Sequence, residues 1–463
     1  MNRRLFHLMN IRGLLLSSAL LASCAVGPDY EMPTKELEAS FKNAGFTTPP
    51  PEGSWWVLYR DGDLNKLIKQ ADLKGQGVRS ALARYDGARA QLGLAKAETY
   101  PALVGDAFAN RQQDSANTNF SGGSYDDYRA ALNLSWEIDL WGRIRRDIGR
   151  VSAENEAVGY DYQGVILSLR GEVTRAYLSL RFADAEIALL ARTETLRRDA
   201  RNLMQKRFKL GANSRIDFER SVTEHESVKA ELGELRARRG NFENALAVLT
   251  GKSAAGFQLK STGKLPQIPT APSAVPSDLL RRRPDLAAAE RRLAAASETI
   301  GLAIASYLPR VTLNGAGGVR SLSSSDLIDS GSKLWRLGPE LELPLFQGGR
   351  AISDKAKAEA GYREALGIYR GKLLNAIRET EDALGDSRYL AGTSASRKRG
   401  ASAANSAARL TRKRYTSGVT DYFEVVDAER TALSEERAAL SVDLARALAS
   451  TRLIQALGGG WTR

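Results

Sequence analysis

The sequence predicts an α+β membrane protein in which β-strands cross the bilayer and long helices lie outside it. Three observations support this fold class. Beyond the N-terminal segment, no stretch of about 18 apolar residues could span a bilayer as a helix. Four segments alternate between apolar and polar residues, as strands do. Two proline-free stretches, residues 142–210 and residues 349–463, carry apolar residues at heptad spacing.

The composition argues against an enzyme. The 463-residue chain has 67 Lys and Arg against 54 Asp and Glu, and this surplus is spread among many acids, which indicates a solvated surface rather than a nucleic-acid tract. His7, His225 and Cys24 are too few for a disulfide, a zinc site or a Cys–His dyad. We therefore expect no catalytic residue, metal or cofactor, and we expect His225 and the run Arg281–Arg283 to be solvent-exposed.

Residues 1–23 predict a lipoprotein signal peptide. Arg3 and Arg4 precede the apolar run Ile11–Leu21, which is shorter than the roughly 20 residues that a membrane-spanning helix needs. The run ends in Leu-Ala-Ser-Cys, which resembles the bacterial lipobox, so Cys24 would carry covalent lipid at the start of a segment covering 24–60. The alternative is a buried cysteine behind an ordinary signal. Ala25 in place of an acid favours the outer membrane.

Four strands are expected near residues 102–113, 128–138, 310–322 and 335–345. In the second, Leu132 and Leu134 alternate with Asn133 and Ser135, and Ser/Gly/Asp-rich loops at 114–127 and 323–333 join the strands in pairs. A β-hairpin of a soluble protein, with one face on the core and the other exposed to solvent, would show the same alternation. Four strands cannot close a barrel, so two, three or four protomers would have to share one.

The chain repeats itself at a spacing of 207 residues. Gly142-Arg143 matches Gly349-Arg350, and Gly211 matches Gly418. We therefore expect a first repeat at 61–251, a linker at 252–276 and a second repeat at 277–463, each repeat carrying a helix, two strands and a long helical hairpin. Gly211 and Gly418 would turn the two hairpins.

Several motifs are specific in combination: the lipobox, Trp55-Trp56, Asp61 to Leu64, Leu280 to Leu286, Leu345 to Arg350, and Ser417 to Arg430. Together they make the chain similar to the TolC/OprM outer-membrane efflux family, in its NodT-like lipoprotein branch. The resemblance implies a homotrimer with one β-barrel of four strands per protomer in the outer membrane, continued by a long periplasmic α-helical barrel and a mixed equatorial region. It implies an exit duct that receives drugs or other small molecules from a periplasmic adaptor and an inner-membrane pump of the RND type.

The same resemblance implies a gate at the hairpin tips. Phe423 would be an apolar plug, and Glu424 and Asp427 would form acidic rings around the axis, although Asp427 could instead be an acid at a helix start. Arg215 and Asp217 are candidate partners of these acids. The tips that would meet the adaptor or pump carry Arg207, Gly211, Arg414 and Gly418.

Two other functions fit parts of the pattern. A duct for type I protein secretion would share the architecture, but the lipobox and the efflux-branch motifs disfavour it. A structural periplasmic coiled-coil lipoprotein would account for the helices and the anchor, but it would leave the four alternating segments unexplained.

Overall fold

The computed structural model describes residues 25–33, 41–42, 53–115, 117, 123–269 and 282–460. The chain forms two compact units, and each contains segments from both sequence repeats, so the repeats are not separate compact bodies. One unit, here the sheet unit, comprises Met1–Thr34, Arg84–Gly159 and Ala288–Arg370; the other, the hairpin unit, comprises Lys35–Ala83, Tyr160–Ala287 and Gly371–Arg463. Within the described ranges, none of the helices has the length and apolarity that crossing a membrane requires.

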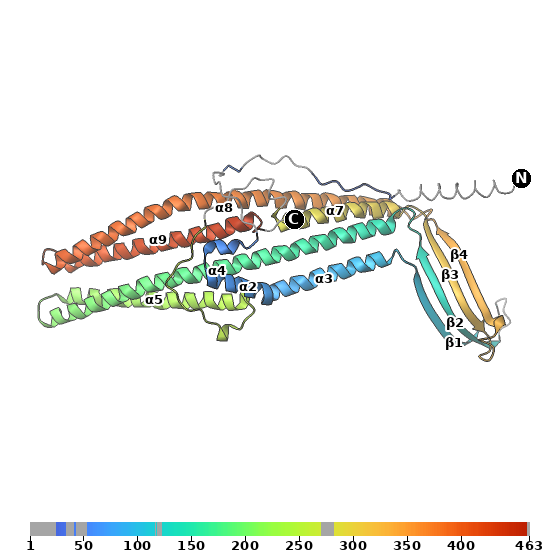
Figure 1. Ribbon diagram of the computed structural model, residues 1–463, viewed down its shortest axis with the longest axis horizontal. Helices are drawn as coiled ribbons and strands as arrows, with labels where there is room; N and C mark the ends of the chain where they lie inside the picture. Colours follow the sequence, from blue (N-terminus) through green and yellow to red (C-terminus); the bar gives the residue numbers. More distant parts are fainter. Residues whose placement is uncertain are drawn as a thin grey trace. The chain divides into compact units, whose positions relative to one another are not determined.

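The sheet unit contains one antiparallel four-stranded sheet in the order β1-β2-β3-β4 (Figure 1). The strands are β1 (Ala102–Gln113), β2 (Ser124–Glu137), β3 (Arg310–Ser321) and β4 (Lys333–Glu342). All four expected strands are present; β1 has the predicted ends, and the ends of the other three differ from the prediction. Residues 124–127 pair within β2 rather than forming a loop, whereas Ile138, Leu343 and Leu345 lie beyond the strands.

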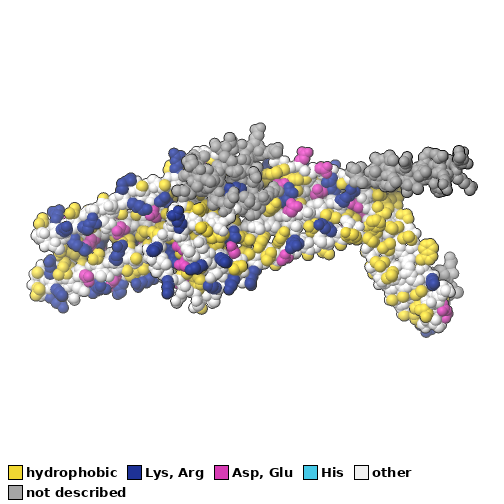
Figure 2. Space-filling model, viewed as in Figure 1, with side chains coloured by type: hydrophobic (Ala, Val, Ile, Leu, Met, Phe, Trp, Pro, Cys, Tyr) yellow, Lys and Arg dark blue, Asp and Glu magenta, His cyan; other side chains and the backbone are white. Residues whose placement is uncertain are grey.

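The predicted alternation is visible in the pairing. Leu132 lies opposite Gly105 and Gly317, so the apolar side chains of β2 share a face with small residues of its neighbours. On the opposite face, Arg129 lies 3.6 Å from Asp106. Arg320 donates two hydrogen bonds to Asp127 on the same polar face, at 2.9 and 2.8 Å. Apolar side chains gather over the strands in Figure 2.

One long helical hairpin follows the strands of each repeat. α4 (Arg143–Lys209) and α8 (Arg350–Thr416) each have 67 residues, and α5 (Arg215–Leu249) and α9 (Tyr422–Ala456) each have 35. Both pairs are related by the spacing of 207 found in the sequence. Along α4 the heptad positions Val173, Leu180 and Leu190 are fully buried, which explains their spacing.

The first repeat begins with two helices where one was expected. α2 (Gly62–Lys74) and α3 (Gln76–Ala97) are separated at Gly75, and α7 (Pro284–Ala305) precedes the strands of the second repeat. Before α2, a short 3₁₀ segment, η2 (Trp55–Tyr59), places Trp55 and Tyr59 in the core of the hairpin unit. The Tyr59 hydroxyl lies 2.8 Å from Ser450 Oγ and 2.7 Å from Thr451 Oγ1, which fixes η2 against α9.

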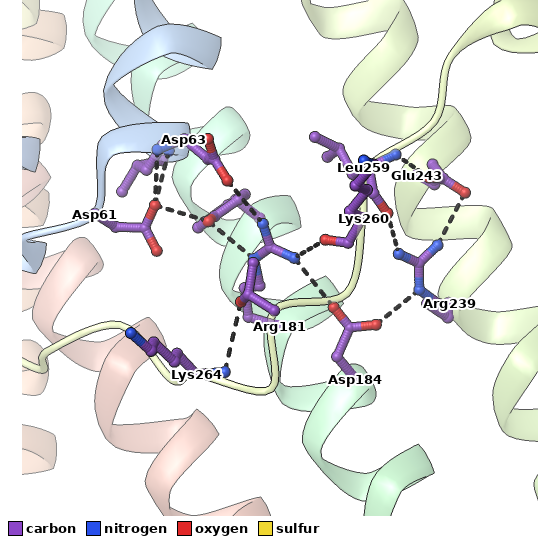
Figure 3. A network of polar contacts seen from close by, with 12 residues as sticks. Asp61, Asp63, Arg181, Asp184, Arg239, Glu243, Leu259, Lys260 and Lys264 are labelled. Atoms are coloured by element: carbon purple, nitrogen blue, oxygen red, sulfur yellow. Dashed lines mark hydrogen bonds and ion pairs between the residues drawn. The ribbon is translucent and has the colours of Figure 1, made fainter.

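A buried polar network holds the segment after α5 against α4 (Figure 3). Arg181 is 1% exposed, and it donates to the carbonyl of Lys260 at 2.7 Å and to Asp184 at 3.2 Å. Arg239 on α5 donates to the other oxygen of Asp184 at 2.8 Å. Asp61 caps α2 and also accepts from the Tyr177 hydroxyl, so the acidic pair of the sequence motif at Asp61 and Asp63 has a structural role here. The network therefore joins α2, α4, α5 and the following segment.

Candidate gate at the tips of the two helical hairpins

The two hairpin tips have the same backbone geometry. Gly211 and Gly418 both have φ of +71°, in the left-handed region that glycine adopts without strain. The amide of Ala212 donates to the carbonyl of Arg207 at 2.8 Å, and the amide of Val419 donates to Arg414 at 2.9 Å. These bonds close the ends of α4 and α8 as a glycine cap does, so both glycines reverse the chain where the sequence predicts.

Capping side chains start the second helix of each hairpin. Ser214 Oγ accepts from the amide of Asp217 at 3.1 Å, and Asp421 Oδ1 accepts from the amide of Glu424 at 3.0 Å. The helix-start role considered for Asp427 therefore belongs to Asp421, because Asp427 is the sixth residue of α9 and lies beyond its first turn. An acid three residues before a glutamate is the capping signal that could have identified Asp421.

The three expected gate residues share the exposed side of α9. Phe423 is 53% exposed, and Glu424 and Asp427 are also exposed. Between them Val425 and Val426 turn into an apolar cluster around the fully buried Met204. The helix therefore presents one aromatic ring and two carboxylates on its free side, held by apolar packing on the other.

The candidate partners from the first hairpin are engaged elsewhere within the protomer. Arg215 lies 3.4 Å from Glu219 on its own helix, and Asp217 accepts the Ser214 hydroxyl at 2.8 Å. The contact with the expected plug comes instead from Arg220, whose guanidinium lies 4.8 Å from the centroid of the Phe423 ring. A cation over an aromatic face is attracted by the ring. No motif in the sequence singles out Arg220.

The two arginines at the hairpin tips, Arg207 and Arg414, differ in their contacts. Arg207 donates to the Tyr415 hydroxyl at 2.7 Å and lies over its ring, so it ties the first hairpin to the second. Arg414 is exposed and contacts no carboxylate in the described part of the chain. The docking role expected for Arg207, Gly211, Arg414 and Gly418 stays a prediction.

A chain of five alternating charges lies between the tip and the middle of the hairpins. At its centre Arg197 on α4 is 2% exposed, and it lies 3.1 Å from Glu429 on α9 and 3.7 Å from Glu224 on α5. Arg430 pairs with Glu224, and Arg412 on α8 pairs with Glu429. The chain thus includes a residue from each of the four hairpin helices.

Two exposure predictions are wrong. His225 is only 5% exposed, because α5 packs it against α4, where its Nε2 lies 2.9 Å from Glu194. Arg283 is 9% exposed, since it forms ion pairs with Asp285 and Glu379, each at 2.8 Å. Arg281 lies outside the described residues.

Cys24 also lies outside the described residues, but the chain immediately after it is well fixed. Val26 donates from its amide to the carbonyl of Trp141 at 3.1 Å. The buried Arg146 donates to the carbonyls of Val26 and Gly27 at 3.0 and 3.1 Å. Gly142 has φ of +80°, and a Cβ there would lie 2.7 Å from the Cα of Ala25. Residue 25 is therefore held beside the chain between β2 and α4.

Comparison with known proteins gives a consistent result. The family model described as "Outer membrane efflux protein" matches residues 67–252 and 275–459. The chain is 32% identical to outer membrane protein OprJ of Pseudomonas aeruginosa, over 96% of this chain and 95% of that one. It is 26% identical to the cation efflux system protein CusC of Escherichia coli, over 95% of this chain and 96% of that one. The solved structure of the outer-membrane channel OprN superposes with a TM-score of 0.88 at 29% identity, covering 95% of this chain and all of that one.

These matches confirm the fold class expected from the sequence, an α+β membrane protein of the trimeric β-barrel and helical-barrel type. The matched family is one of channels and its members act in efflux across the outer membrane. The chain belongs to the outer membrane efflux protein family and serves as the outer-membrane exit duct of a tripartite efflux system.

Proposed function

We propose that this duct exports organic small molecules, as a homotrimer without catalytic activity that is closed at its hairpin tips and lipid-anchored through Cys24. Its partners are a periplasmic adaptor and an inner-membrane pump of the RND type. The observation that carries the proposal is the free side of α9, where Phe423, Glu424 and Asp427 stand exposed at the end of a hairpin. Three copies around one axis would place an aromatic plug and two acidic rings across the duct.

The ligand chemistry of the chain supports organic cargo over soft metal cations. Copper(I) and similar ions require Cys, Met or His donors along their path. Among the described residues, Met204 is fully buried and His225 is 5% exposed, and both are already in contact with other side chains. Met32 is 40% exposed, but it lies in the N-terminal segment and not on the helices of the two hairpins. The described part of the chain also holds no group of three His, Cys, Asp or Glu arranged to bind a metal.

The position of Ala25 supports a lipid anchor on the preceding cysteine. Ala25, which directly follows Cys24 in the sequence, lies beside Gly142. That contact is five residues beyond the end of β2 at Glu137. An acyl chain attached there would start close to the end of a strand whose apolar face suits lipid, at the surface of the membrane.

Transport in cells tests this proposal. The chain would be expressed together with an adaptor and RND-type pump in a bacterium deleted for its own outer-membrane efflux ducts. We expect accumulation of a fluorescent organic dye to fall to the level of the undeleted strain, while copper tolerance stays at the level of the deleted strain. Restored copper tolerance with unchanged dye accumulation would contradict the organic substrate class.

A further inference from the structure

The C-terminal part of α8 and the turn after it, residues 387–420, contain no acidic residue. Residues 387–420 include eight Arg or Lys and no Asp or Glu. The corresponding residues of the first repeat, 180–213, have the same number of basic residues but also four acids, Asp184, Glu186, Glu194 and Asp199. The two repeats have therefore diverged in charge on this helix. The eight basic residues are Arg388, Arg397, Lys398, Arg399, Arg409, Arg412, Lys413 and Arg414.

Three of these basic residues are neutralised by α9. Arg397 lies 3.2 Å from Glu435, Lys398 lies 2.7 Å from Asp443, and Arg412 pairs with Glu429. The other five are exposed, and none of them contacts a carboxylate in the ranges that the structure describes. We call these five the basic face of α8: Arg388, Arg399, Arg409, Lys413 and Arg414.

The basic face occupies one side of α8. Arg388 and Arg399 are eleven residues apart, close to three helical turns, and the whole set spans about 140° of the circumference at about 100° per residue. Arg399 and Arg409 donate to serines one turn earlier, at 3.2 and 2.9 Å. Apart from Leu410, which is 62% exposed, the other side chains in this sector are small. They are Ala391, Gly392, Ala395, Ser396, Ser402, Ala403 and Ser406.

We propose that the basic face of α8 docks an acidic α-helix of the periplasmic adaptor. The inference rests on the proposed function, which places this hairpin in the periplasm beside an adaptor. A partner helix with carboxylates at eleven-residue spacing would meet Arg388, Arg399 and the Arg409–Lys413 pair in register, about 16 Å apart along the axis. The small residues between them let two helices approach to about 8–10 Å, and Leu410 supplies an apolar contact.

Charge complementarity favours a helix of another protein over a second copy of this chain as the partner of the basic face. A neighbouring protomer would need several free acids at matching spacing, but three acids of α5 already pair within the protomer. Of the acids at positions 219–234 of α5, all in the described part of the chain, Glu234 alone is exposed without an ion pair, and one acid cannot match three basic positions. Figure 2 shows Lys and Arg outnumbering Asp and Glu on the visible side of the hairpins. The paired acids are Glu219 with Arg215, Glu226 with Lys229, and Glu231 with Arg437.

Site-specific photocrosslinking in cells tests the proposal. A photoreactive amino acid would replace Ala395, an exposed alanine between Arg388 and Arg399 on the basic face, or Ala237, an exposed alanine of α5. The probe is the epitope-tagged adaptor of the transport assay. We expect the residue at position 395 to crosslink to a helix of the adaptor that carries acids at eleven-residue spacing, and we expect the residue at position 237 to give no such product.

Charge reversal supplies the matched control. The triple variant R388E/R399E/R409E should reduce the crosslink at least about fivefold, because like charges now face each other. Changing the mapped acids of the adaptor to Lys should restore the crosslink to that variant. The control R79E/R236E/R238E makes the same charge change at exposed arginines of α3 and α5 and should leave the crosslink unchanged.

Three outcomes would overturn the docking proposal: a crosslink from position 395 to a second copy of the chain, a crosslink that charge reversal does not change, or no crosslink to the adaptor. The proposed function is read separately, from dye accumulation with the unmodified chain. If the unmodified chain fails to lower dye accumulation, the proposed function fails. If it succeeds while R388E/R399E/R409E transports equally well, only the docking proposal fails. Trimer formation and single-channel conductance of the triple variant confirm that the duct itself is intact.

Discussion

The guanidinium of Arg197 lies 3.1 Å from the carboxylate of Glu429, and this ion pair joins the first hairpin to the second inside the protein. Neither member has a charged counterpart in the other repeat, where the residues 207 positions away are Ala404 and Val222. The same holds for the other three members of the charge chain, whose counterparts are Thr431, Thr223 and Gln205. Duplication therefore produced two matching hairpins, and later divergence gave this chain of charges to one side of each hairpin, with the ion pair of α4 and α9 at its centre.

Removing the central charge should destabilise the protein. Arg197→Met takes one arginine from Glu224 and one from Glu429, but each acid keeps a second arginine. The cost should therefore be below the cost of leaving a buried charge without any partner, which is about 3–5 kcal/mol. We expect a lower midpoint of thermal unfolding for the purified trimer. Arg198→Met, at a neighbouring side chain that is 46% exposed, should cost less than about 0.5 kcal/mol. Equal unfolding midpoints for the two variants would show that the charge chain contributes nothing to the stability of the trimer.

Two equivalent glycines should respond differently to the same change. Gly142 and Gly349 have φ of +80° and +83°, so alanine strains both, but only at Gly142 would the new Cβ meet Ala25. We expect Gly142→Ala to raise hydrogen exchange of the amides in residues 25–33, and Gly349→Ala to leave it unchanged. If both variants protect these amides as the unmodified chain does, the N-terminal segment is not held at this position.

The carboxylate of Asp443 should make stability depend on pH. Burial raises its pKa, but hydrogen bonds from Lys398 and Ser394 outweigh burial, so the pKa lies below its ordinary value of 3.8. The resulting stabilisation is present above pH 3.8 and is lost as the pH falls through the lower folded-state pKa. Asp443→Asn should therefore cost about 1.5–3 kcal/mol at pH 7 and progressively less at acid pH. Unfolding midpoints measured across pH check this, and a difference that stays constant down to about pH 2 would contradict it.

Opposite faces of β2 should tolerate charge differently. Leu132→Arg places a guanidinium on the apolar face, at a cost of about 2–4 kcal/mol near the bilayer midplane. Ser135 is exposed on the polar face, so Ser135→Arg should be tolerated. Asn133 is a poorer control, because its side chain bonds Asp106 and Arg129. Trimer recovered from outer membranes is the measurement, and equal losses for the two arginine variants would show that the faces are assigned wrongly.

Local periodicity explains most of what the sequence predicted. Strand alternation, heptad spacing and the glycine turns at Gly211 and Gly418 depend on residues that are close in the sequence, so they can be predicted without knowing the tertiary structure. The capping role of Asp421 could also have been predicted, because its spacing from Glu424 is a capping signal. The burial of His225 was not, since it depends on the face that α5 turns to α4.

The charge chain and the contact of Arg220 with Phe423 could not be predicted for the same reason. Each brings together single residues from different helices, and an arginine on a helix is most often a solvated one. Nothing in the neighbourhood of Arg197 in the sequence distinguishes it from Arg198. The difference is that the former faces α9 and the latter faces solvent.

The gate is the central claim, and single-channel conductance in planar bilayers tests it most directly. The purified trimer should conduct poorly, and divalent cations added on the hairpin side should reduce the current further by binding the rings of Glu424 and Asp427. Phe423→Ala should raise the basal conductance, because it removes the plug and its contact with Arg220. The double variant E424A/D427A should weaken the divalent block while trimer stability is kept, because these exposed side chains make few contacts within the protomer. Unchanged conductance in the first variant together with unchanged block in the second would contradict the account and move the gate to the first hairpin, near Arg215 and Asp217.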